Sequence, residues 1–263
     1  MEDNHFMWLS REFNLGYFMI ADGHGGEAVS EFLSKTLHWN IHHYLKQVDM
    51  NWLDAKQVEK MFEDVFSITD KQILRQKMFQ SGATAVVCIV RYDPVRKCRQ
   101  ICVANVGDAR AVLCRANKAV RLSEDHKPSD SKEAMLIKKR HGFVNRQQRV
   151  NGLLAVTRAF GDHLLKPPVS ILPYVTCTDI GVDGRDDFLL LACDGLFDVM
   201  TDTEVVEYIT DNMCQKLGVQ TWPQIYAHDN YKRAAAETME QLVRFAIDKR
   251  RTLDNVSVML VCL

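Results

Sequence analysis

Net charge, long apolar runs and paired cysteine motifs are all missing from this sequence, and each absence excludes a class of protein. Lys plus Arg, 33 residues, nearly balances Asp plus Glu, 34 residues, so bulk charge favours neither nucleic acid nor an anionic membrane surface. The longest apolar runs fall well short of the ~18 residues that span a bilayer, and nothing near Met1 resembles a signal peptide. We therefore expect no nucleic-acid partner and no membrane partner.

The cysteines and the composition favour one intracellular domain. Eight cysteines form no CxxC motif and lie mostly within apolar runs, which is typical of reduced thiols in a protein core. The chain is 47% hydrophobic, enough for a sizeable core, and no repeat, low-complexity linker or domain boundary interrupts it. We predict a single domain over residues 1–263, a monomer of the cytoplasm or nucleus.

The stretch YFMIADGHGG, residues 17–26, is the one around which the chain is organised. Its apolar part predicts a short buried strand, and the glycines after it allow a sharp exit. Asp22, expected at the end of the strand, and the carbonyl of Gly23 offer hard oxygen ligands to Mg²⁺ or Mn²⁺, while His24 offers a proton near neutral pH. The alternative for this segment alone is an ordinary Asp-Gly turn beside a surface histidine.

Periodicity and turn signals predict helices and antiparallel strands. Short β-branched pieces between residues 83 and 122 are separated by tight turns, including Gly107-Asp108, and such short links join antiparallel strands. Gly142 is expected to close a helix in a left-handed cap. The other predicted elements are helices at 27–48, from Asp54 with Gln57 in a capping box, at 201–213 and at 232–250, and strands at 187–193 and 256–263.

Aspartates recur where apolar strands end. Asp22, Asp108, Asp194 and Asp254 each adjoin such a strand at a turn. If these strand ends meet, like charges would repel one another, and bound divalent cations would resolve the conflict. Asp198, four residues after Asp194, would share its face of a helical turn and add another ligand. For any one junction, the alternative is that aspartate simply favours turns and caps.

Ordered motifs over nearly the whole chain resemble those of the metal-dependent protein serine/threonine phosphatases of the 2C type. They are MED at the start, DGHGG, SGATA where the family usually has GSTA, VANVGDARAVL, LSEDHKP, RVNGLLAVTRAFGD, LLLACDGLFDVM and DNVSVMLV. The resemblance implies an α+β fold, a four-layer α/β/β/α sandwich with two central antiparallel sheets. It also implies phosphoprotein substrates and two Mn²⁺ or Mg²⁺ ions, with a weaker third site.

The resemblance also implies roles for individual residues. Asp22 would bridge two metal ions, and a metal-bridging hydroxide would attack the phosphorus while His24 protonates the departing serine or threonine oxygen. The metal ligands implied are Glu2, Asp3, Asp22, Gly23, Asp108, Asp194, Asp198 and Asp254, of which Glu2 and Asp3 act through waters and Asp108, Asp194 and Asp198 form the weaker site.

Departures from the family pattern leave a second reading open. The chain has His141-Gly142-Phe143-Val144 where the family has two glycines before valine, and the flap region, residues 162–176, differs as well. The family's first strand, with its phosphate-clamping arginine, has no counterpart before Met1. We therefore expect an unpaired sheet edge and poor anchoring of Glu2 and Asp3.

The alternative function is a catalytically weakened docking or regulatory module. A haloacid-dehalogenase-type phosphatase is excluded because Asp194 lacks the Asp-x-Asp partner.

Overall fold

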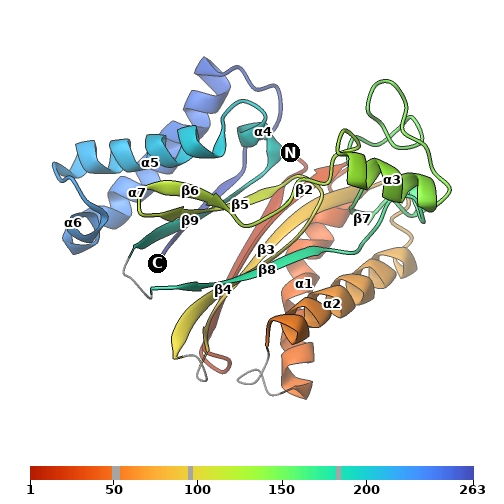
Figure 1. Ribbon diagram of the computed structural model, residues 1–263, viewed down its shortest axis with the longest axis horizontal. Helices are drawn as coiled ribbons and strands as arrows, with labels where there is room; N and C mark the ends of the chain where they lie inside the picture. Colours follow the sequence, from red (N-terminus) through yellow and green to blue (C-terminus); the bar gives the residue numbers. More distant parts are fainter. Residues whose placement is uncertain (49–53, 94–96, 182–184) are drawn as a thin grey trace. The chain divides into compact units, whose positions relative to one another are not determined.

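The computed structural model describes residues 1–48, 54–93, 97–181 and 185–263 (Figure 1). It contains two compact units: Met1–Ala109 with Ser123–Ile180, and Arg110–Leu122 with Gly181–Leu263. Each unit has one antiparallel sheet with helices packed against it. This confirms the predicted α+β fold with two antiparallel sheets.

The sheet of the first unit has the strand order β1-β2-β3-β4-β8, and the short β7 pairs with β3. β1 was not predicted from the sequence, yet it pairs along its whole length with β2. The strands are β1 (Asn4–Ser10), β2 (Leu15–His24), β3 (Gly82–Asp93), β4 (Cys98–Val106), β7 (Phe160–Gly161) and β8 (Tyr174–Ile180).

Two long helices cover one face of this sheet (Figure 1). The alternate residues Tyr17, Met19 and Ala21 of β2 are buried in the same hydrophobic cluster as the apolar faces of both helices. Asp54 begins the second helix in the predicted capping box. The helices of this unit are α1 (Ala28–Gln47), α2 (Ala55–Arg75) and α3 (Ser131–Lys139), with a 3₁₀ turn at His163–Leu165.

The second unit has the strand order β10-β9-β5-β6. Buried residues of β5 and β9, including Val112, Phe188 and Leu190, form its core with the helices that follow. The elements are β5 (Arg110–Arg115), β6 (Lys118–Arg121), β9 (Asp186–Ala192), α4 (Asp194–Phe197), α5 (Asp202–Leu217), α6 (Trp222–Ala227), α7 (Tyr231–Arg244), a π turn at Phe245–Lys249 and β10 (Val258–Cys262).

One predicted pairing is wrong. The turn at Gly107-Asp108 does not join two paired strands, because β4 pairs with β3 and β8, whereas β5 pairs with β9 and β6. The short link therefore carries the chain from one sheet to the other. Asp108 lies in this connection and not in a hairpin.

The predicted cap at the end of α3 is also wrong. His141, and not Gly142, takes the left-handed conformation, with φ of 65°. Gly142 is needed for a different reason: a Cβ at this position would meet Pro168 Cβ at 2.7 Å and Ile137 Cγ2 at 3.0 Å. Close packing, not backbone freedom, therefore fixes glycine there.

Among the helices that the structure describes, none is both long and apolar enough to cross a membrane.

Candidate metal centre

The Asp22-Gly23-His24 segment forms the last three residues of β2, so the predicted strand extends further than expected. It pairs with β3 in the register Asp22↔Thr84, Gly23↔Ala83 and His24↔Gly82. A Cβ on Gly23 would lie 2.5 Å from the carbonyl oxygen of Glu2 and 2.8 Å from Ser30 Oγ. Glycine is therefore required because the start of the chain crosses directly over this position.

Glu2 and Asp3 are firmly anchored at this crossing, and the expectation of poor anchoring is wrong. Glu2 accepts a hydrogen bond from the backbone N–H of Gly26 through Oε1, at 3.0 Å, and its carbonyl accepts one from the Ser30 hydroxyl. The side chain of Asp3 is buried, and its Oδ2 has no hydrogen-bond partner among the described residues. A buried carboxylate oxygen in this state is costly unless a further group binds it.

His24 is held by a residue that the sequence did not single out. Its Nε2 lies 2.7 Å from Oδ2 of Asp162, whose side chain is only 11% exposed. Gly82 makes room for the pair, since a Cβ there would clash with both side chains. In the sequence, Asp162 marked only the start of the flap region, and its place as the last residue of the RVNGLLAVTRAFGD motif was the one available signal. The ring of His24 is thus oriented by a carboxylate.

Asp108 is placed by the turn that changes sheets. It is 4% exposed, and its Oδ2 lies 3.2 Å from Nζ of Lys127. The backbone of Gly107 exchanges two hydrogen bonds with His126: Gly107 N–H donates to Nδ1 at 3.1 Å, and His126 N–H donates to the Gly107 carbonyl at 3.0 Å. Gly107 also packs on Thr84, the pairing partner of Asp22. The turn therefore lies beside the strand end that carries Asp22.

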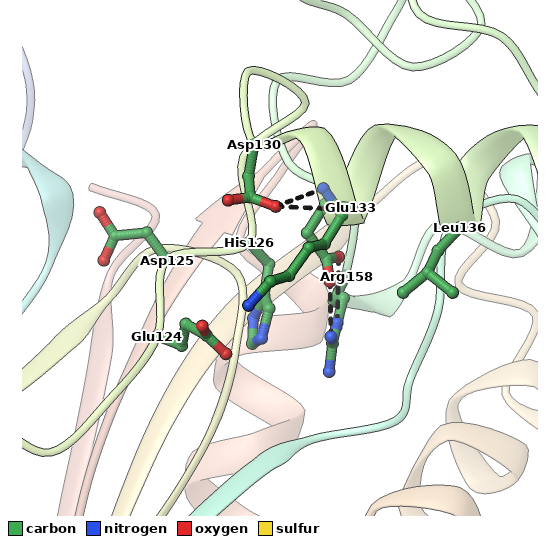
Figure 2. Close-up of a pocket in the computed structure, with 8 residues that line it drawn as sticks. Glu124, Asp125, His126, Asp130, Glu133, Leu136 and Arg158 are labelled. Carbon is green, nitrogen blue, oxygen red and sulfur yellow. Dashed lines mark hydrogen bonds and ion pairs between the residues drawn. The ribbon is translucent and has the colours of Figure 1, made fainter.

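His126 also lines a cavity of about 130 Å³ (Figure 2). Burial, followed by the nearby positive charge of Arg158, lowers the pKa of His126 to about 4, so its imidazole is neutral near pH 7. Figure 2 shows Arg158 beneath α3, where it binds Glu133 through two nitrogens. The cavity is lined by Glu124, Asp125, His126, Asp130, Lys132, Glu133, Leu136 and Arg158.

Replacing Glu133 by Gln is expected to destabilise the protein by about 3 kcal/mol at pH 7, because it leaves the mostly buried Arg158 without its counter-charge. Burial would raise the pKa of Glu133, but hydrogen bonds from Arg158 and Thr157 outweigh it and lower the pKa. Its contribution is therefore present above the unfolded pKa of about 4.3 and lost as pH falls through the folded value. Urea unfolding of both forms, at neutral and acidic pH, checks this.

Glu124→Gln is the matched control, because Glu124 lines the same cavity but is exposed. This variant is expected to stay within about 0.5 kcal/mol of the unmodified protein. If the loss of unfolding free energy in Glu133→Gln did not become smaller at acidic pH, the ionised carboxylate would not be what stabilises the cavity wall.

The second unit holds the remaining predicted ligands. Asp194 begins α4 and Asp198 caps its end, with the Asp198 N–H donating to the Asp194 carbonyl at 2.8 Å, as the helical-turn prediction requires. Gly195 packs directly on the backbone of Asn255, next to Asp254. Cys193 N–H donates to the Ser257 carbonyl at 3.2 Å, which ties the start of α4 to the segment after Asp254.

The structure thus groups the predicted site residues in two clusters, one in each unit. The strand-end cluster contains Glu2, Asp3, Asp22, Gly23, His24 and Asp108. The α4 cluster contains Asp194, Asp198 and Asp254.

A model of the protein phosphatase 2C family matches residues 1–255. The chain belongs to the protein phosphatase 2C family. It is 36% identical to protein phosphatase 2C homolog 1 of Schizosaccharomyces pombe, over 99% of this chain and 68% of that protein. It is 34% identical to protein phosphatase 2C homolog 1 of Saccharomyces cerevisiae, over 100% of this chain and 88% of that protein.

Solved structures share the 2C fold of this chain. A sex determining protein of Caenorhabditis elegans superposes with a TM-score of 0.79 at 24% identity, over 99% of this chain. The chain spans 61% of that protein, less than two thirds of its length. Taken with the curated relatives, the family assignment makes this chain a protein serine/threonine phosphatase of a metal-dependent family, with phosphoproteins as its class of substrate.

Proposed function

We propose that this 2C phosphatase hydrolyses phosphoserine and phosphothreonine with the help of two Mn²⁺ or Mg²⁺ ions, for which the two clusters supply the ligands. The observation that carries the proposal is Oδ2 of Asp3, a buried carboxylate oxygen without a hydrogen-bond partner among the described residues. The backbone carbonyl of the neighbouring Glu2 lies against Gly23, so this oxygen belongs to the strand-end cluster.

The chemistry of the donors fits these metals. Carboxylates and a glycine carbonyl are hard oxygen ligands, which Mg²⁺ and Mn²⁺ prefer. In this proposal Asp22, the Gly23 carbonyl, Asp194 and Asp254 are the direct ligands. Glu2 and Asp3 contribute through waters, and Asp108 and Asp198 serve a weaker third site with Asp194. When bound, such a pair of cations activates a water and neutralises charge on the phosphoryl group.

His24 is proposed as the general acid for the leaving serine or threonine oxygen. Its hydrogen bond to Asp162 supports this role, because a carboxylate on one edge of the imidazole fixes the orientation of the ring. Asp162 would then be a positioning residue. The side chain of His24 remains 30% exposed, which leaves it accessible to a substrate.

Removal of metal tests the proposed function. Activity on a phosphoserine peptide is expected to require added Mn²⁺ or Mg²⁺ and to disappear with EDTA, since a site of carboxylates and waters binds these ions loosely. Readdition of Mn²⁺ should restore the rate. Undiminished hydrolysis by thoroughly chelated protein would contradict the two-metal proposal, and no hydrolysis with either ion would favour the docking or regulatory module.

A further inference from the structure

Two cysteines face each other across the sheet of the first unit. Cys102 on β4 and Cys177 on β8 are directly opposed in an antiparallel pairing. Their Sγ atoms are 2.6 Å apart. Opposed residues of antiparallel strands have Cα separations of about 4.5 to 5.5 Å, within the range of about 4.4 to 6.8 Å that a disulfide spans. Backbone and sulfur positions are therefore both compatible with a covalent link.

The two thiols differ in exposure and in acidity. Cys102 is 1% exposed, whereas Cys177 is half-buried and lies on β8, the last strand of the sheet order. The hydrogen bond between the two thiols lowers the pKa of Cys177; burial opposes this, and the positive charge of nearby Arg91 adds to it, so that the pKa is lowered overall. The same hydrogen bond, together with burial, raises the pKa of Cys102. Cys177 is thus the more accessible sulfur and the one that ionises first.

Two other cysteines, Cys88 and Cys262, lack this combination. Cys88 on the neighbouring strand β3 is fully buried, and burial raises its pKa far above the usual value. Cys262 is exposed, but its pKa is raised by burial of the thiol itself. All eight cysteines lie in the described part of the chain, and none is in a disulfide there. The resting pair is therefore a dithiol.

We propose that Cys102 and Cys177 are an oxidation site at which a hydroperoxide converts the dithiol into a reversible cross-strand disulfide. The site goes beyond the phosphatase reaction and does not depend on the proposed metal ligands. Cys177, one of its two residues, lies on β8, the strand that follows residues 162–173, the segment that contains Asp162.

The chemistry balances in two steps. The Cys177 thiolate attacks an oxygen of the hydroperoxide, so the S–O bond forms, the O–O bond breaks and an alcohol or water leaves, giving a sulfenic acid. Cys102 then attacks the sulfenic sulfur: the S–S bond forms, the S–O bond breaks and water departs with the thiol proton. Overall, two thiols lose two electrons and two protons, and the peroxide is reduced. A dithiol reagent reverses the process by exchange.

Peptide mapping of the oxidised full chain tests the proposal. The protein is treated with stoichiometric hydrogen peroxide, alkylated with N-ethylmaleimide in denaturant, digested without reductant and analysed by mass spectrometry. We expect one linked peptide pair joining Cys102 to Cys177, lighter by two hydrogen atoms than the sum of the dithiol peptides and lost after dithiothreitol. The oxidised protein should also unfold at a higher temperature than the reduced one, because the link restricts the unfolded chain.

Matched variants assign the site. Cys177→Ser should abolish the linked peptide, whereas Cys262→Ser, which removes a thiol of the second unit, should leave it unchanged. If Cys177→Ser does not fold, the map of the unmodified protein decides alone. The proposal is overturned if Cys177 accumulates as sulfinic acid without a linked peptide, if either cysteine links instead to Cys88 or Cys98, or if both remain fully alkylated after peroxide treatment.

Discussion

Asp194→Asn is expected to lower kcat/KM on a phosphoserine peptide by about 10²-fold or more, because metal-assisted charge stabilisation contributes several kcal/mol to the transition state and each 1.36 kcal/mol is tenfold in rate. Asp194 is the first residue of α4, and its carbonyl accepts a hydrogen bond from the N–H of Asp198. The substitution keeps this backbone contact and the shape of the side chain. The loss should therefore come from weakened metal binding and not from misfolding.

Two measurements separate these causes. Titration calorimetry with Mn²⁺ should show a weaker or missing binding event, whereas thermal unfolding without metal should be unchanged or shifted upwards, since one negative charge has been removed from the cluster. Asp211→Asn makes the same chemical change at an exposed position of α5 and should change neither the Mn²⁺ affinity nor the unfolding temperature. Unaltered Mn²⁺ affinity in Asp194→Asn would remove Asp194 from the set of ligands.

Local signals in the sequence predicted the helices well. The capping boxes at Asp54 and Thr201 involve residues three positions apart, so the sequence shows both partners at once. The buried face of α1 likewise follows from spacing alone, with Val29, Leu33 and Leu37 all buried. Such features depend on neighbours within one or two turns.

Strand partners were harder, for a physical reason. In β1 the outward residues Met7 and Leu9 are apolar and are 65% and 71% exposed, so the alternation that identifies a half-buried strand is hidden. The turn at Gly107-Asp108 has the residues of a hairpin, but β5 pairs with β9, some 75 positions later in the chain. Pairing at that distance leaves no local signature.

Long-range contacts also explain what was missed at the site. The sequence identified Asp22, His24 and the α4 aspartates, because each belongs to a recognisable motif. Asp162 is 138 positions from His24, and Cys177 is 75 positions from Cys102. Only the folded sheet brings these partners together. The sequence therefore predicts residues with intrinsic chemistry better than those that orient or modify them.

His24→Gln is expected to slow hydrolysis of a phosphoserine peptide by about 10²-fold, the low end of the usual contribution of a general acid. An alkoxide leaving group needs a proton, whereas the phenolate of p-nitrophenyl phosphate leaves without one, so the aryl substrate should lose much less. Asp162→Asn should produce a smaller loss with the same preference, since it disturbs only the hydrogen bond that orients the ring. Initial rates on both substrates, at saturating Mn²⁺, give the comparison.

His43→Gln is the matched control, because His43 is an exposed histidine on α1 that forms a hydrogen bond with Gln47, one turn away. It should leave both rates unchanged. Equal losses on the two substrates in His24→Gln would mean that His24 supports the fold or the metal ligands instead of donating a proton. If His24→Gln slowed only the hydrolysis of the phosphoserine peptide, His24 would be the proton donor to the leaving oxygen. Asp162 follows β7, which pairs with β3, and it belongs to the flap region. If Asp162→Asn loses rate on the peptide, but less than His24→Gln does, the flap region contributes to that proton transfer through the hydrogen bond to His24.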